Sequence, residues 1–176
     1  ETGNHTLGKS GQGGEHESGM MANSVTACAR IAAFGAGFTL LTDTQRHQAY
    51  RALLDTIACA IAGRGDDASR LATNYMRGCS GPGAITQATV WATGETMHAE
   101  GAAFVNGVAA HVLDYDDVMT PMRGHISVAM VPALCALAQT TGADGQRFSS
   151  AYLAGFELMA KFARVMALPH YSRGWH

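Results

Sequence analysis

The first strong pattern in the chain is a set of apolar residues at helical spacing between two polar breaks. Thr42-Asp43-Thr44 has the residue types that cap a helix N-terminus, and the apolar positions that follow lie three or four residues apart: Tyr50, Leu53, Leu54, Ile57 and Ile61. Gly63 and Gly65 then provide a stop signal. The pattern is helical from about Thr26 onward, and these two breaks delimit the first predicted long helix.

The same criteria predict four further helices and almost no extended structure. They are expected from Asp66-Asp67 to the glycines of 78–83, with Leu71 and Tyr75 on one side, from about Met97 to Asp114, after Gly124, and from about Arg147 to Met166. Pro132 requires the helix after Gly124 either to begin close to it or to be kinked there. Residues 88–92 (ATVWA) are the one short apolar piece expected to be extended. Because no useful run alternates between apolar and polar residues, we expect an all-α fold.

Residues 1–20 differ from the rest of the chain. They are rich in glycine, and Leu7 is their only aliphatic residue before Met20. Such a segment buries too little apolar surface to offset the entropy lost on ordering, and it lacks the apolar centre of a signal peptide. We therefore predict a disordered leader at 1–20, native or added for expression, and one folded unit at 21–176.

Composition narrows the class of protein. The 176 residues (18.4 kDa) are 47% hydrophobic and 15% charged, with a net charge of −2 and a pI near 6.5. This balance excludes a basic nucleic-acid-binding protein and global disorder, and no apolar stretch is long enough to span a membrane. The four cysteines are scattered without a CxxC pair, which indicates a reducing, cytoplasmic setting, and Cys59 and Cys135, each inside an apolar helical segment, are expected to be core residues.

Candidate chemistry is concentrated in residues 106–127. If the helix expected to end at Asp114 continued, His111, Asp114 and Asp117 would stand at i, i+3 and i+6 on one side of it. Acids at a helix C-terminus oppose the macrodipole, which indicates a functional site, although a solvated Asp-rich turn explains the run equally well. His125 is expected to open the next helix, where the dipole favours a neutral imidazole that can act as a general base. The alternative is a histidine that only caps the helix or lies in a loop.

Other site types fit the sequence poorly. The chain has no zinc-type spacing and no calcium loop, so we predict no metal and no other cofactor. The glycines of 78–83 lack the Lys-Ser/Thr of a phosphate-binding loop. Residues 114–117 (DYDD) match the DxDD motif of one terpene cyclase class, but aromatic residues make up only 7% of the chain, too few for a carbocation pocket.

The chain resembles the MmgE/PrpD family over roughly residues 26–176. The resemblance rests on six segments in the family's order: LLDTIA at 53–58, NGVAAHVLDYDD at 106–117, RGHIS at 123–127, VPAL at 131–134, AGFE at 154–157 and RGWH at 173–176. The family includes 2-methylcitrate dehydratase, cis-aconitate decarboxylase and iminodisuccinate epimerase. It implies proton transfer next to a carboxylate of di- and tricarboxylic acids without an obligatory metal. It also implies a large helical domain, a smaller α+β lid domain, and a homodimer formed through the helical part.

The resemblance assigns roles residue by residue. Asp114, His125 and His176 fall on the family's catalytic positions, and His111, Asp117, Arg123 and Ser127 are expected to contact substrate. Two positions depart from the family pattern: Ile126 replaces the usual proline after the histidine, and Val118 replaces a threonine near the substrate.

The resemblance predicts the N-terminal part of the helical domain, truncated before the lid. The function expected is therefore part of a metal-independent lyase that dehydrates or decarboxylates a small carboxylic acid. No nucleic acid and no membrane partner is expected. A second prediction, from a different class, is a non-catalytic helical fragment that only dimerises or binds a partner, because a cut helical domain exposes apolar faces.

Overall fold

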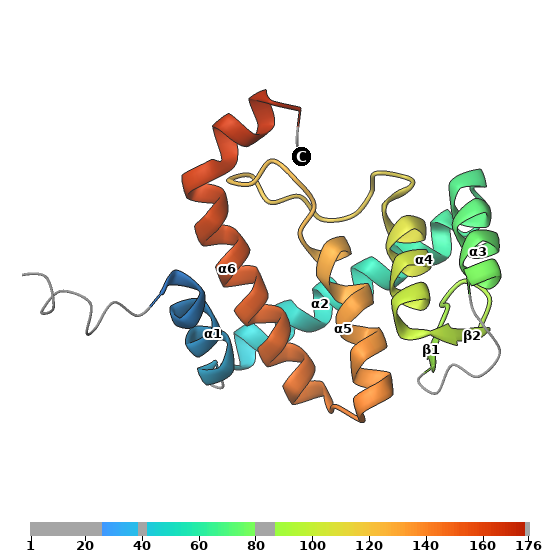
Figure 1. Cartoon of the computed structure of the whole chain (residues 1–176), viewed down its shortest axis with the longest axis horizontal. Coiled ribbons are helices and arrows are strands. Elements are labelled where there is room, and N and C mark those ends of the chain that lie inside the picture. The colour runs from blue at the N-terminus through green and yellow to red at the C-terminus, as the bar shows by residue number, and fades with distance from the viewer. Residues whose placement is uncertain (1–25, 39–41, 80–86, 175–176) are drawn as a thin grey trace, which may run out of the picture.

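The computed structural model describes residues 26–38, 42–79 and 87–174. This part of the chain contains six helices and one small β-hairpin, which lies between the third and fourth helices in the sequence (Figure 1). The helices are α1 (Ala27–Gly37), α2 (Asp43–Gly63), α3 (Asp67–Cys79), α4 (Ala99–His111), α5 (Ser127–Thr141) and α6 (Gly145–Ser172). The strands β1 (Gln87–Thr89) and β2 (Thr96–His98) pair antiparallel, with Ala88 opposite Met97. The predicted all-α class is confirmed. Of the segment expected to be extended, 88–92, only residues 88 and 89 lie in β1, and residues 91 and 92 lie in the turn of the hairpin. The predicted leader at 1–20 lies outside the described residues.

Local sequence explains where the helices begin and end. Thr42 and Gln45 form a capping box at the start of α2: each side chain accepts a hydrogen bond from the other residue's backbone N–H, at 3.2 and 2.9 Å. Gly142 ends α5 in the left-handed conformation, with φ of 67°, and its N–H bonds to the carbonyl of Ala138. The helix expected after Gly124 begins at Ser127, so Pro132 lies within it rather than near its start.

Three groups of buried residues hold the helices together. The hairpin, α3, α4 and α5 share one core that includes Val90 and Val105, and α2, α5 and α6 share another that includes Val131 and Tyr152. Between α2 and α4 runs a third contact made of small residues, Cys59, Ala60, Ala109 and Ala110, which we call the α2–α4 seam. Figure 1 shows α2 crossing behind α6, α5 and α4, and α2 contacts all three of these helices.

Buried Asn106 attaches the hairpin to α4. Its amide oxygen accepts from the backbone N–H of Trp91 at 2.9 Å, and its amide nitrogen donates to the carbonyl of Thr89 at 3.0 Å. Asn106 is 2% exposed, and these two bonds satisfy it. The hairpin and α4 therefore form one unit. In the described residues, no helix is both long and apolar enough to cross a membrane.

Candidate functional site

The segment between α4 and α5 carries the candidate site. The helix predicted from about Met97 to Asp114 ends at His111, so it does not continue through Asp117 and the condition under which His111, Asp114 and Asp117 would share a helix face is not met. The backbone N–H of Asp114 instead bonds to the carbonyl of His111 at 2.8 Å, and Asp114 adopts φ of 55°. Asp is one of the few residues that tolerates this left-handed conformation, which ends the helical course here.

A second turn brings the segment back toward α4. Met119 and Gly124 form an isolated antiparallel bridge, closed by Arg123 at φ of 53°. The return places His125 beside His111, and the two rings meet edge to face with their centroids 4.6 Å apart. Two residues that are fourteen positions apart in the sequence thus become direct neighbours.

Two carboxylates face the two imidazoles. His125 Nε2 lies 3.1 Å from Asp114 Oδ1, and His125 Nδ1 lies 3.1 Å from Asp116 Oδ2. Asp116 also accepts from His111, whose Nδ1 is 3.0 Å from Oδ1. The side chains differ in exposure: Asp116 is 0% and His125 16% exposed, whereas His111 is 51% and Asp114 77% exposed. His111 and Asp114 therefore form the solvent-exposed side of the cluster, which we call its open face, and Asp116 lies buried beneath them.

Asp116 is the residue that the sequence-based prediction missed. A continuous helix would have turned it away from the face shared by His111, Asp114 and Asp117, so the wrong helix end hid it. The available signal was the Asp-rich run itself, which is typical of a turn. Within a turn, helical spacing no longer determines which of the three aspartates points inward.

Asp117 and Ser127 bond to each other. Asp117 accepts the backbone N–H of Ser127 at 3.1 Å and its hydroxyl at 2.5 Å, which joins the segment to the first turn of α5. Because the Ser127 proton is used there, the Tyr152 hydroxyl donates to Ser127 Oγ at 2.8 Å. The pKa of Tyr152 is raised, mainly because the side chain is buried. The hydrogen bond with Ser127 opposes this shift, and the negative charge of Asp117 adds to it. Ser127 is fully buried, so it has no surface open to a small molecule in this structure.

The remaining predicted residues are placed less centrally. Arg123 is exposed at the tip of the second turn. His176 lies outside the described residues.

The cluster also offers ligands for a metal ion. One donor atom each from His111, Asp114, Asp116 and His125 lies within 4.8 Å of the others. Two imidazoles and two carboxylates suit zinc and several other divalent ions. The expectation that the protein uses no metal therefore stays a prediction.

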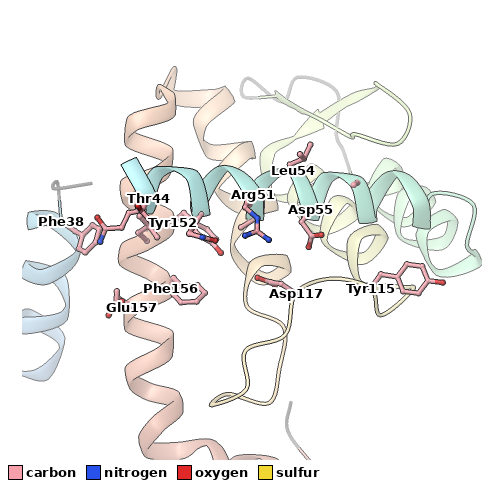
Figure 2. A pocket seen from close by; sticks show the side chains of 15 residues that line it. Phe38, Thr44, Arg51, Leu54, Asp55, Tyr115, Asp117, Tyr152, Phe156 and Glu157 are labelled. Carbon is pink, nitrogen blue, oxygen red and sulfur yellow. The ribbon is translucent and has the colours of Figure 1, made fainter. Parts of the chain in front are cut away.

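A pocket of about 840 Å³ lies between α2 and α6 and is bordered by the same segment (Figure 2). Its lining includes Asp117 and Tyr115 from the segment, Arg51 and Asp55 from α2, and residues of α6 such as Phe156. His125 is not among the lining residues, so the pocket is adjacent to the imidazole cluster and separate from it. Arg51 offers a guanidinium that could pair with a carboxylate, and no sequence motif marks it.

Comparison with known proteins adds the family. Residues 29–176 match the model of the MmgE/PrpD N-terminal domain. Cis-aconitate decarboxylase from Homo sapiens and from Mus musculus are each 34% identical over 121 residues, which is 68% of this chain and 24% of the relative. The matched region is about a quarter of the length of these relatives. The helical fold, the ordered motifs and the matched domain agree, and the chain therefore belongs to the MmgE/PrpD family through the N-terminal domain of that family.

Proposed function

We propose that this chain is part of a lyase that acts on di- or tricarboxylic acids, by proton transfer at the carbon next to a carboxylate and without a metal. The observation that carries the proposal is the placement of His125 between two carboxylates, each 3.1 Å from one ring nitrogen. The similarity to cis-aconitate decarboxylase supports the class of substrate and reaction.

The geometry gives His125 and Asp114 complementary roles. In dehydration, Nε2 of His125 takes the proton from the substrate carbon while the hydroxyl group on the neighbouring carbon is protonated by a second acid and leaves as water; in decarboxylation, His125 instead delivers a proton to the carbon that loses CO₂. Asp114 Oδ1 lies 3.1 Å from Nε2, beside the atom that exchanges the proton. Asp114 thereby stabilises the positive charge of the imidazolium through proximity to Nε2, whereas Asp116, 3.1 Å from Nδ1, lies where the carboxylate of a catalytic triad lies. His176, assigned by family resemblance, acts as the second acid or as the oxyanion partner.

Substrate contacts in this proposal come from the open face of the cluster. His111 is half exposed beside His125, and Arg123 supplies a positive charge for a carboxylate from the nearby turn. Asp117 and Ser127 support the site, because their mutual bonds hold the segment on α5. A cytoplasmic location is part of the proposal and is supported by the four free cysteines.

The test is turnover by His125→Gln in the natural polypeptide that contains this sequence, after its intact mass has been measured. We expect a loss of ~10²–10⁴-fold in rate on cis-aconitate, methylcitrate or a related acid, the usual contribution of a general acid or base. His47→Gln is the matched control, because His47 is exposed on α2 outside the cluster. Wild-type turnover by His125→Gln would refute the assignment.

A second candidate function is a helical module that dimerises without catalysis. The observation that favours it is a set of large apolar side chains facing solvent, among them Val165 at 81%, Leu54 at 70%, Leu71 at 69% and Tyr75 at 67%. Apolar surface of this kind marks association sites. Light scattering distinguishes the two functions when combined with the assay: a dimer without turnover supports the module, and a monomer contradicts it.

A further inference from the structure

Asp116 is the most deeply buried charged side chain of the cluster, and it touches both histidines. Its oxygens lie 3.0 and 3.2 Å from His111 Nδ1, and Oδ2 lies 3.1 Å from His125 Nδ1. Its side chain is 0% exposed, so solvent does not compete for these contacts. One carboxylate thus faces the same ring atom of two different imidazoles.

The chemistry of a carboxylate determines which proton each ring carries. An ionised carboxylate can only accept hydrogen bonds, so a nitrogen that bonds to it must be protonated. The bond to His111 therefore requires Nδ1–H on that ring. His125 Nδ1 is buried and, although it is 3.1 Å from Oδ2, it is not aligned for a hydrogen bond. Catalytic hydrogen bonds are often misaligned without substrate and align in the complex, and Asp116 is the buried acceptor within reach of Nδ1. Asp114 lies equally close to Nε2, at 3.1 Å, but its side chain is 77% exposed, so water competes for that contact and the buried carboxylate has the stronger influence on the ring.

The geometry points to Asp116 as a positioning residue that holds His111 and His125 in the Nδ1–H tautomer, so that His125 presents an unprotonated Nε2 to the substrate. The tautomer of His111 follows from its hydrogen bond to Asp116, that of His125 is inferred from the buried carboxylate beside Nδ1, and the catalytic consequence rests on the proposed function. In this arrangement the two aspartates have different tasks: Asp116 selects the tautomer before reaction, and Asp114 stabilises the positive charge that the ring gains.

The substitution Asp116→Asn makes the proposal testable, because it keeps the shape and changes one acceptor into a donor. An asparagine side chain offers one accepting oxygen and one donating NH₂ group. It can satisfy Nδ1–H of one ring, but the other ring then faces a donor and must accept at Nδ1. At least one of the two histidines therefore has to change to the Nε2–H tautomer.

The first measurement is nitrogen NMR of the purified protein with ¹⁵N-labelled histidine, at a pH where the rings are neutral. Signals are assigned with His111→Gln and His125→Gln. We expect both rings as Nδ1–H in the wild type and at least one as Nε2–H in Asp116→Asn. Asp67→Asn is the matched control, because Asp67 is an exposed carboxylate on α3 paired with Arg70, and it should leave both tautomers unchanged.

Two results would overturn the proposal: an Nε2–H tautomer for His125 in the wild type, or unchanged tautomers in a folded Asp116→Asn. The wild-type spectrum decides the question even if Asp116→Asn fails to fold. In the kinetic experiment, Asp116→Asn should lower kcat by about 10²-fold or more with little change in KM, as a wrong tautomer does. If the tautomers change as expected while His125→Gln retains full turnover, the proposed function fails and the role of Asp116 in setting the tautomers stands.

Discussion

Gly63→Ala tests whether the α2–α4 seam determines how closely the two helices approach. A Cβ at Gly63 would lie 2.2 Å from the carbonyl oxygen of Ala109 and 2.6 Å from Cγ1 of Val112. Cβ atoms essentially never come closer than 3.0 Å to another heavy atom, and a backbone carbonyl cannot rotate away. The helices must therefore separate locally by about 0.8 Å, the difference between 2.2 and 3.0 Å.

The loss of stability expected for Gly63→Ala depends on which atom the new Cβ contacts, and here that atom is a backbone carbonyl oxygen. Overpacking a well-packed interior typically costs about 1–3 kcal/mol, and the upper part of this range applies because the obstacle is backbone. We expect the free energy of unfolding to fall by about 2–3 kcal/mol, which corresponds to a decrease in Tm of roughly 4–12 °C for a chain of this size. The displaced turn of α4 carries His111, so the edge contact between the two imidazoles should change as well.

Urea and thermal unfolding, followed by far-UV circular dichroism, measure this effect. Gly65→Ala is the matched control, because a Cβ there would meet nothing within 4 Å, and its effect should be at most about 0.5 kcal/mol. If Gly63→Ala were as stable as Gly65→Ala, the reasoning would be refuted, since the helices would then have room that the described contact denies them.

Three further predictions concern the cysteines, the segment and the metal. Iodoacetamide at pH 8 should label exposed Cys28 and spare Cys135, because burial raises the pKa of the Cys135 thiol to about 11. Peptide mass mapping should show labelling of Cys135 rising about tenfold per pH unit up to that value, and equal rates at pH 8 would contradict it. Asp117→Ala removes the acceptor of two bonds from Ser127 and should cost about 1–3 kcal/mol in urea unfolding; an unchanged midpoint would show that these bonds contribute nothing. Dialysis against a chelator should leave turnover unchanged, whereas loss of activity that one divalent ion restores would assign that ion to the imidazole cluster.

The helices could be predicted because their signals are local. The capping box at Thr42 and Gln45 and the terminal Gly142 act within a few residues, and the structure places helix ends at both. Residues 88–92 had β-type residues in a short apolar run, and β1 begins one residue before them.

The arrangement of the candidate site depended on a backbone conformation that the sequence leaves open. An aspartate at position 114 is compatible both with a continuing helix and with the left-handed conformation that it adopts. The return of the segment to α4 depends on Arg123 as well, a residue that rarely has a positive φ. The prediction therefore named His125 and Asp114 as site residues, but it could not identify Asp116 as the residue between the two histidines.

The α2–α4 seam has a consequence for how the site can vary. Ala60, Ala109 and Ala110 of the seam, and Gly63 beside it, have no side-chain torsion angles, so only Cys59 of the seam can change rotamer, and the interface adapts less easily than a contact between leucines can. A larger side chain here is therefore accommodated mainly by a shift of helix backbone rather than by a change of rotamer. The position of the His111 ring, at the end of α4, thus depends on how closely α4 packs against the backbone of α2. Substitutions in the seam can therefore shift the site without changing any of its polar groups.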